Sequence, residues 1–284
     1  MAGASKLPHP ITGELFDSPV PPGTGWPDDP AAADTPVAHT AADVARLADL
    51  DDLAELDARV SVCRACPRLV TWREEVAETK RASFADQPYW GRPIAGWGDA
   101  DAPIVIIGLA PAANGGNRTG RIFTGDSSGD WLFAALHRAG LARLSTSTRA
   151  GDGQRLTDVR IAAAVRCAPP ANAPTPEERD TCRPWLVREL EFLRPRLAVI
   201  VVLGGFGWAS LWPALVEAGY EVPARRARFG HLAEVELPGG ILVLGSYHPS
   251  QQNTFTGKLT EDMLDAVFAR AVAAAREAVP DVGT

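Results

Sequence analysis

The sequence predicts an α/β fold in which a mostly parallel sheet carries helices on both faces. Four short apolar runs, most of them rich in valine and isoleucine, have the composition of buried strands: residues 104–107, 160–165, 197–203 and 241–244. Segments with helical spacing of apolar residues lie between and after them, at 131–139, 176–193, 208–218 and 260–278. Strands that alternate with helices in this way typically form a parallel sheet covered on both sides.

The segments outside this alternation predict an arm, a helix and a hairpin. Residues 1–40 contain eight prolines and no hydrophobic periodicity, which favours a disordered arm. Residues 40–60 repeat apolar side chains at helical spacing, and they predict a lead-in helix that ends at the first cysteines. The Pro-Gly-Gly turn at 238–240 predicts a hairpin between 234–237 and the last strand. We therefore expect one domain over residues 41–278, followed by a short tail at 279–284.

The charge is divided unevenly along the chain. Residues 1–58 carry eleven acidic residues against two basic ones, a net charge of −9, whereas the whole chain has a net charge of −7. The remainder therefore has a net charge of +2 and can contact phosphate through local arginines, of which the candidates are Arg118, Arg121, Arg225, Arg226 and Arg228. No apolar segment has the length of a signal-peptide core or a bilayer span, so we expect a cytoplasmic protein without a membrane partner.

The whole cysteine complement consists of four residues that bracket a glycine-rich loop. Cys63 and Cys66 are three positions apart, Cys167 follows after 100 intervening residues and Cys182 after 14 more. Four cysteines can form disulfides, bind zinc, ligate an iron-sulfur cluster or be unrelated buried thiols. Disulfides rarely persist in the cytoplasm, so metal ligation is the favoured interpretation. The spacing alone does not separate zinc from iron-sulfur.

Three loops follow predicted strands at the carboxyl edge of the sheet, where the sites of such folds lie. The first loop, residues 108–129, is rich in glycine but lacks the Gly-Lys-Ser/Thr ending of a P-loop, which disfavours nucleotide hydrolysis. Within it, Phe123 could stack on a planar base or serve as a core anchor. Asp126 could polarise a water molecule or cap the helix that follows.

The second and third loops each contribute one candidate side chain. Asn172 lies in the loop after Cys167, and its amide both donates and accepts hydrogen bonds, as reading a nucleobase edge requires; a turn residue is the alternative. His248 follows the last predicted strand, and Pro249 fixes the backbone after it. Of the five histidines, it alone stands at a predicted strand end in a polar loop. His248 is therefore the strongest candidate for a functional imidazole.

Taken together, the three loops resemble the uracil-DNA glycosylase superfamily, and most closely its family 5 enzymes. The resemblance rests on Gly108-Leu109-Ala110-Pro111-Ala112 with Phe123-Thr124-Gly125-Asp126, on Cys167 through Asn172, and on the run from His248 to Phe255. It covers roughly residues 60–275, with the cysteines in family order. It implies a three-layer α/β/α sandwich with a four-stranded, mainly parallel sheet, and a structural [4Fe-4S] cluster on Cys63, Cys66, Cys167 and Cys182.

The resemblance also implies an activity. Enzymes of this kind hydrolyse the N-glycosidic bond of uracil in DNA, and family 5 tolerates other deaminated bases such as hypoxanthine, which starts base excision repair. The base leaves the stack before its bond is broken. The expected partner is double- or single-stranded DNA that contains uracil, bound by a monomer in the cytoplasm at the nucleoid.

Positions that match the family's motifs imply a role for each residue. His248 would donate a hydrogen bond to uracil O2, Phe123 would stack on the flipped base, and Asp126 would position or activate water. Asn172 would assist recognition or catalysis. The backbone around the base and sugar would come from Gly108, Ala110, Pro111 and Ala112. Contacts to DNA are expected from Arg118, Arg121, Ser250, Gln251, Gln252 and Asn253.

Departures from related families leave some roles open. Ala112 or its apolar neighbours replace a water-activating polar residue, and Ala163 replaces a base-reading asparagine; both agree with family 5. The run after His248 offers polar side chains or Phe255 where an apolar wedge is usual. Two other functions remain as alternatives: a protein that captures uracil in DNA without turnover, and a structural interaction protein whose cysteines bind zinc.

Overall fold

The sheet forms the centre of the structure, a computed structural model that describes residues 6–278. Its strand order is β3-β5-β4-β6-β8-β7, in which β5, β4, β6 and β8 run parallel and the two edge strands run antiparallel. The strands are β3 (Trp97–Gly98), β4 (Ile104–Gly108), β5 (Val159–Ala163), β6 (Val199–Leu203), β7 (Glu234–Glu236) and β8 (Leu242–Ser246). The four predicted parallel strands are confirmed, as is the β7–β8 hairpin. β3 was not predicted, because two residues carry no readable pattern.

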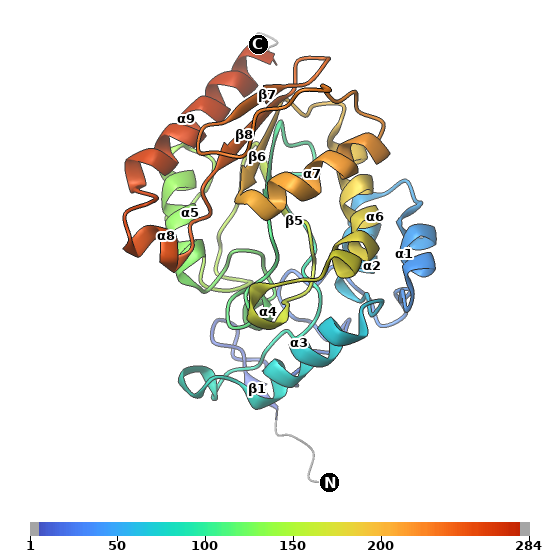
Figure 1. Cartoon of the computed structure of the whole chain (residues 1–284). Coiled ribbons are helices and arrows are strands. Elements are labelled where there is room, and N and C mark those ends of the chain that lie inside the picture. The colour runs from blue at the N-terminus through green and yellow to red at the C-terminus, as the bar shows by residue number, and fades with distance from the viewer. Residues whose placement is uncertain (1–5, 279–284) are drawn as a thin grey trace, which may run out of the picture.

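Helices cover both faces of this sheet and make it the middle of three layers (Figure 1). Ile104 and Ile106 of β4 pack on one side with residues of α5 and α9, while Val105 and Ile107 pack on the other with residues of α6 and α7. This alternation is what a strand buried on both faces requires. The helices are α1 (Ala41–Ala48), α2 (Leu53–Ser61), α3 (Pro67–Thr79), α4 (Gly116–Thr119), α5 (Ser127–Arg138), α6 (Pro176–Leu193), α7 (Gly205–Glu217), α8 (Gln251–Phe255) and α9 (Glu261–Ala278).

The single lead-in helix expected over residues 40–60 is two helices. Thr40 caps α1 through a capping box with Asp43, and Asp52 caps α2 by accepting a hydrogen bond from the Glu55 amide. Aspartate is more stable at an N-cap than in a helix interior. The acidic stretch between the two helices therefore ends α1 and begins α2. The apolar spacing continues across the break because both helices bury their apolar side chains in one cluster.

The expectation of a disordered arm is wrong for the described part of the first 40 residues. They form a small hairpin of β1 (Leu7–Pro8) with β2 (Leu15–Phe16), and they bury Phe16, Val20 and Trp26 in the main core. Each such side chain stabilises the fold by about 1.5–3 kcal/mol when fully buried. Asp29 also makes two 2.9 Å hydrogen bonds with the Arg92 guanidinium, and both side chains are buried. A few buried apolar side chains and one buried ion pair are therefore enough to order a segment whose composition is typical of disorder.

The described residues hold no segment with the character of a membrane span. Within 6–278, none of the helices combines the length and the apolar composition needed to cross a bilayer.

Candidate active site

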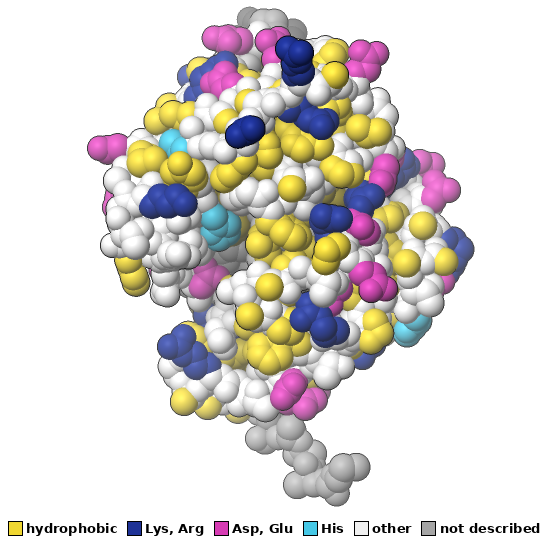
Figure 2. Space-filling view, viewed as in Figure 1, with side chains coloured by type: hydrophobic (Ala, Val, Ile, Leu, Met, Phe, Trp, Pro, Cys, Tyr) yellow, Lys and Arg dark blue, Asp and Glu magenta, His cyan; other side chains and the backbone are white. Residues whose placement is uncertain are grey.

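The three loops singled out from the sequence open at one edge of the sheet. The parallel strands β4, β5, β6 and β8 end at Gly108, Ala163, Leu203 and Ser246, and their register places these ends side by side. Figure 2 shows a hollow on this face of the molecule with a histidine at its rim. This is the edge at which open α/β sheets bind ligands.

Phe123 and His248 meet above the end of β4, although they are 125 positions apart in the chain. Their ring centroids lie 5.7 Å apart with the planes inclined by 35°. A Cβ on Gly108 would lie only 2.8 Å from two atoms of the Phe123 ring, so a glycine is required where the ring rests on the strand end. Gly108, Phe123 and His248 are therefore brought together as the sequence predicted.

The backbone at Phe123 is held in an unusual conformation. Its φ is +48°, the left-handed region that a phenylalanine rarely adopts, at a cost of order 1–3 kcal/mol. The neighbouring residues hold the turn in place, since Thr124 bonds both Ser147 and the Ile122 carbonyl. Backbone strain of this kind is concentrated at functional sites, so it supports a role for the ring beyond filling the core.

His248 is an imidazole that the protein keeps neutral. Burial disfavours the charged form and lowers the pKa of His248 to about 4. The loop is fixed through its backbone, because Asn253 donates from Nδ2 to the His248 carbonyl at 2.9 Å and the Ser250 amide donates to the same oxygen. No described residue hydrogen-bonds either ring nitrogen. A neutral ring with free nitrogens can donate one hydrogen bond to a ligand.

Asp126 caps α5, which is the structural one of the two roles that its sequence left open. Its Oδ1 accepts a 2.9 Å hydrogen bond from the Gly129 amide and so caps α5. Its other oxygen occupies the space that a side chain at position 115 would need, so a larger residue there would displace the Asp126 carboxylate. Burial raises the pKa of the Asp126 carboxyl above its usual range, although the Gly129 amide acts in the opposite direction. One oxygen is thus structural, and the other faces the loop that begins at Gly108.

Asn172 lies apart from this group. It ends the short 3₁₀ turn Pro170–Asn172, is exposed, and has a φ of +54°. Its side chain makes no hydrogen bond to any residue in the described range. The structure therefore places Asn172 as a turn residue on the loop after Cys167, available to a ligand but not joined to Phe123 or His248.

The residues that follow Gly108 connect the two halves of the site. Ala110 packs against Cys167, Leu69 and Val165 on the cysteine side. Pro111 is buried and lies against Gly116 at the start of α4, while Ala112 is partly exposed. This loop therefore spans from the Phe123 side of the hollow to the cysteines.

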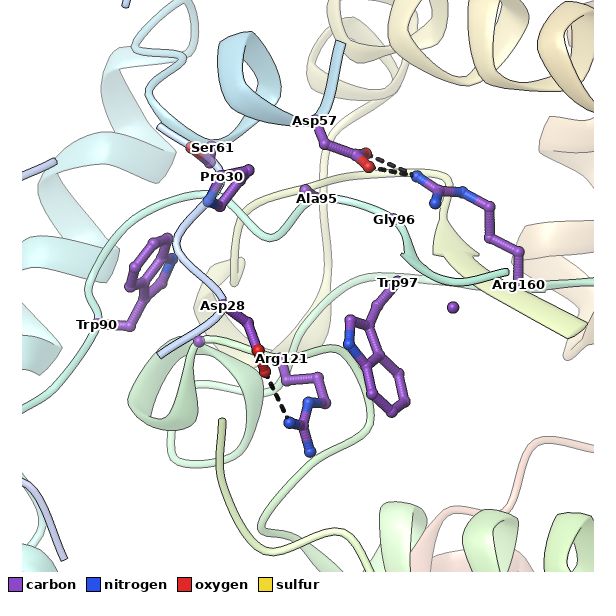
Figure 3. Close-up of a pocket in the computed structure, with 12 residues that line it drawn as sticks. Asp28, Pro30, Asp57, Ser61, Trp90, Ala95, Gly96, Trp97, Arg121 and Arg160 are labelled. Carbon is purple, nitrogen blue, oxygen red and sulfur yellow. Dashed lines mark hydrogen bonds and ion pairs between the residues drawn. The ribbon is translucent and has the colours of Figure 1, made fainter. Parts of the chain in front are cut away.

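Two predicted DNA contacts are corrected by the structure. Arg118 and Arg121 are 4% and 2% exposed, and groups of the protein itself bind their guanidinium nitrogens. Arg118 bonds the carbonyls of Asn114 and Gly125, whereas Arg121 pairs with Asp152 and with Asp28 of the N-terminal segment, as Figure 3 shows for Asp28. Buried and paired arginines cannot reach a phosphate backbone. Both hold the Phe123 loop against the body instead.

The other predicted DNA contacts lie on the surface, on α8. Ser250 caps this helix, Gln251 and Gln252 are exposed, and Asn253 is partly exposed while it bonds the His248 carbonyl. Phe255 ends the helix with 79% of its surface exposed, the highest value among the described large apolar side chains. A polar helix with one exposed ring therefore borders His248.

The four cysteines line one pocket, together with Val44, Leu69, Val70, Pro93, Val165 and Trp185. Arg73 donates to the Cys167 sulfur at 3.0 Å and the Arg166 amide to the Cys182 sulfur at 3.3 Å. These donors were not predicted, since nothing in the sequence near Arg73 indicates a partner 94 positions away. The Trp185 indole nitrogen is buried beside the pocket without a partner. Donors aimed at sulfur and an apolar lining are suited to thiolates that carry a metal group.

The protonation of these thiols depends on what they bind. Burial raises the pKa of Cys63 to about 11 and of Cys66 to about 12, and it also raises the pKa of Cys182. Free thiols are therefore protonated here, and thiolates need a cation. In residues 6–278 no three His, Cys, Asp or Glu side chains converge closely enough to hold one metal ion. The four cysteines line a common pocket instead of converging on one metal position.

The fold and the site define an α/β protein whose carboxyl edge brings an aromatic ring against a neutral histidine, with a carboxylate three residues beyond the aromatic ring on the same loop. The chain belongs to the uracil-DNA glycosylase superfamily, whose model matches residues 95–272. It is 56% identical over 264 residues to the type-5 uracil-DNA glycosylase of Mycobacterium tuberculosis, covering 93% of this chain and 97% of that protein. The type-5 enzyme of Thermus thermophilus is 50% identical over 212 residues, 75% and 93% of the two chains. A type-4 enzyme of Thermotoga maritima is 33% identical over 158 residues, 55% and 69% of the two chains. The resemblance drawn from the three loops is confirmed.

Proposed function

We propose that this protein hydrolyses the N-glycosidic bond of uracil in DNA and leaves an abasic site. The observation that carries the proposal is the pair of Phe123 and neutral His248 at the carboxyl edge of a superfamily fold. The names of the type-5 relatives, at 50–56% identity, support the same activity. Other deaminated bases such as hypoxanthine are further substrates to compare in otherwise identical duplexes.

The reaction breaks the bond between C1′ of deoxyribose and N1 of uracil. The bonding electrons leave with uracil, so negative charge develops on its O2 while C1′ becomes positive. His248 donates a hydrogen bond to O2 from its ring N–H. A neutral imidazole retains one such N–H, so the ring can act as the donor in its neutral form. Phe123 stacks on the flipped base, an interaction worth about 1–3 kcal/mol.

Water completes the reaction at C1′. The free oxygen of Asp126 holds this water and accepts its proton as the new C–O bond forms, while uracil later takes a proton from solvent. Because Ala112 offers no polar group in the first motif, Asp126 carries this task. Asn172 assists from the neighbouring loop as a contact to the base or strand.

The test of this function is a duplex with one uracil opposite guanine. Incubation followed by alkaline cleavage should give a strand break at the uracil, and an identical duplex with thymine should stay intact. A protein-DNA band that survives denaturation, without free abasic product, would indicate capture of uracil in place of turnover. We propose that the protein acts as a monomer, at the nucleoid where its DNA substrate lies.

The pH profile is expected to have one acid limb. Because burial raises the pKa of Asp126, its ionised form should be lost at a pH above that of an ordinary aspartate, and the single-turnover rate should fall there. His248, with a pKa of about 4, should add no limb near 6.5. Rates measured from pH 4.5 to 9 test this, with circular dichroism at each pH to monitor folding. A limb centred near 6.5 that persists in Asp126→Asn would contradict the assignment.

We also propose that Cys63, Cys66, Cys167 and Cys182 hold a [4Fe-4S] cluster. A cluster ties each sulfur to a different corner, so four thiols that surround a space suit it better than they suit a single zinc ion. Its contribution is structural: it would join α2 and α3 to α6 and to the loop that carries Asn172.

Metal analysis provides the test of this assignment. Protein purified without oxygen should be brown and contain about four irons per chain, and Cys182→Ser should lose both colour and iron. The thermal unfolding midpoint should fall in the same variant, because metal binding contributes to folding free energy. Colourless protein with one zinc per chain would overturn the proposal.

A further inference from the structure

A row of unpaired cations lies beside the site. Arg225, Arg226 and Arg228 are exposed and precede β7, and Lys258 follows α8. We call these four residues the basic ridge. Elsewhere on the surface, arginines such as Arg138 and Arg270 pair with carboxylates. In the part of the chain that the structure describes, none of the four takes part in an ion pair or a side-chain hydrogen bond.

Two members of the basic ridge, Arg226 and Lys258, lie over the two ends of a chain of four aromatic rings. Successive centroids are 5.1 Å apart for Trp212 and Trp208, 6.0 Å for Trp208 and Phe229, and 6.3 Å for Phe229 and Tyr247. The guanidinium of Arg226 lies 5.2 Å from the Trp212 ring centroid at one end. The ammonium of Lys258 lies 4.9 Å from the Tyr247 ring at the other end.

This aromatic chain leads directly to the proposed site. Tyr247 immediately precedes His248, and its amide is 3.4 Å from Nδ1 of His231, which follows the arginine loop. Phe229 packs on Gly205, at the start of α7 where β6 has ended. The basic ridge is therefore fixed at the same edge of the sheet as His248. Figure 2 shows Lys and Arg side chains spread over the face around the hollow.

Acidic groups near the basic ridge do not neutralise it. Glu234 on β7 pairs with Arg270, whose guanidinium donates a hydrogen bond to each of the two carboxylate oxygens. Glu221, which precedes the arginine loop, is exposed and makes no ion pair among the described residues. Glu236 and Asp262 are likewise exposed and without an ion pair among the described residues, but neither they nor Glu221 pairs with any of the four cations, which stay open to a ligand on a chain whose net charge is −7. The natural partner of the basic ridge is a polyanion with regularly spaced charges.

We propose that the basic ridge binds the phosphate backbone of the DNA strand beside the flipped nucleotide. This assignment rests on the proposed function for its choice of partner. It replaces Arg118 and Arg121, which are buried, with cations that a strand can reach. The contacts are electrostatic, so they position the strand without reading its sequence.

Salt dependence measures these contacts directly. With an undamaged duplex as the probe, log K plotted against log salt concentration should have a shallower slope for Arg225→Gln/Arg226→Gln/Arg228→Gln than for the unmodified protein, by about 2–3, since each lost phosphate contact removes about 0.9. Lys258→Gln alone should reduce the slope by about 1. The excision reaction of the triple variant should need a higher enzyme concentration for half-saturation.

A matched variant controls for net charge. Arg143, Arg155 and Arg196 are exposed, make no ion pairs within residues 6–278, and precede β5 or β6 at the opposite edge of the sheet. Their triple replacement by glutamine should leave the slope unchanged. An equal decrease in both triple variants, or none in the first, would overturn the proposal. Because the probe carries no uracil, this result is independent of whether the protein excises uracil.

Discussion

Replacing His248 with alanine should lower the single-turnover rate of uracil excision by about 100- to 1,000-fold, because a preorganised donor to the developing charge on O2 is lost. His248→Gln should keep more activity than His248→Ala, since an amide can still donate a hydrogen bond. Rates with enzyme in excess over a U·G duplex measure the effect on chemistry rather than on binding.

The appropriate control for this substitution is another histidine outside the site. His137 lies exposed on α5, where its ring bonds the Ala142 carbonyl. His137→Ala should therefore excise uracil at the unmodified rate. If His248→Ala retained full activity with its fold intact, the assignment of the imidazole to uracil O2 would have to be abandoned.

Replacing Glu189 with glutamine should destabilise the protein by about 3–5 kcal/mol, because it leaves the buried Arg166 without a paired carboxylate and the buried Arg160 with Asp57 alone. Glu189 on α6 binds Arg160 at 2.5 Å and also pairs with Arg166, and all three side chains are almost completely buried. Burial by itself raises the pKa of Glu189, but the two arginines outweigh it and hold the pKa below its usual range. Urea unfolding monitored by tryptophan fluorescence gives the free energy of unfolding.

A neighbouring residue of the same type provides the comparison. Glu191 lies two positions further along α6, is about one-third exposed, and pairs with Arg188. Glu191→Gln should cost about 0–1 kcal/mol, because solvent screens an exposed pair. If the two variants were equally stable, the buried network would not be what fixes α6, with its Cys182, against β5.

The parts of the fold that could be predicted from sequence are those whose signal is local. β4 and β6 are unbroken runs of buried apolar residues, and the Gly239–Gly240 turn marks the β7–β8 hairpin. A strand buried on both faces needs such a run, so its sequence is nearly unambiguous. The three site loops followed from these strands, because parallel strands end at a common edge.

The parts that could not be predicted depend on partners distant in sequence. Asp29 looks like a residue of a disordered acidic arm until Arg92 is placed opposite it. Arg121 looks like a surface cation until Asp152 and Asp28 are seen around it. The composition of a segment gives its number of charges, but it does not reveal which charged side chains form ion pairs with one another. The arm and the arginines were therefore misjudged for the same physical reason.

The arrangement of the cysteines has a consequence for how the chain is made. Cys63 and Cys66 emerge from the ribosome 116 positions or more before Cys182, and β4 and β5 must be synthesised in between. At bacterial or eukaryotic rates of about 5–20 residues per second, that interval lasts roughly 6–23 seconds. During translation the first two thiols therefore precede their partners, and the proposed cluster would be enclosed only after α6 has been added. Cys182 is still synthesised before β6, β8 and the His248 loop, so the proposed cluster could be loaded on a nascent chain that has its Phe123 loop but not yet its His248 loop.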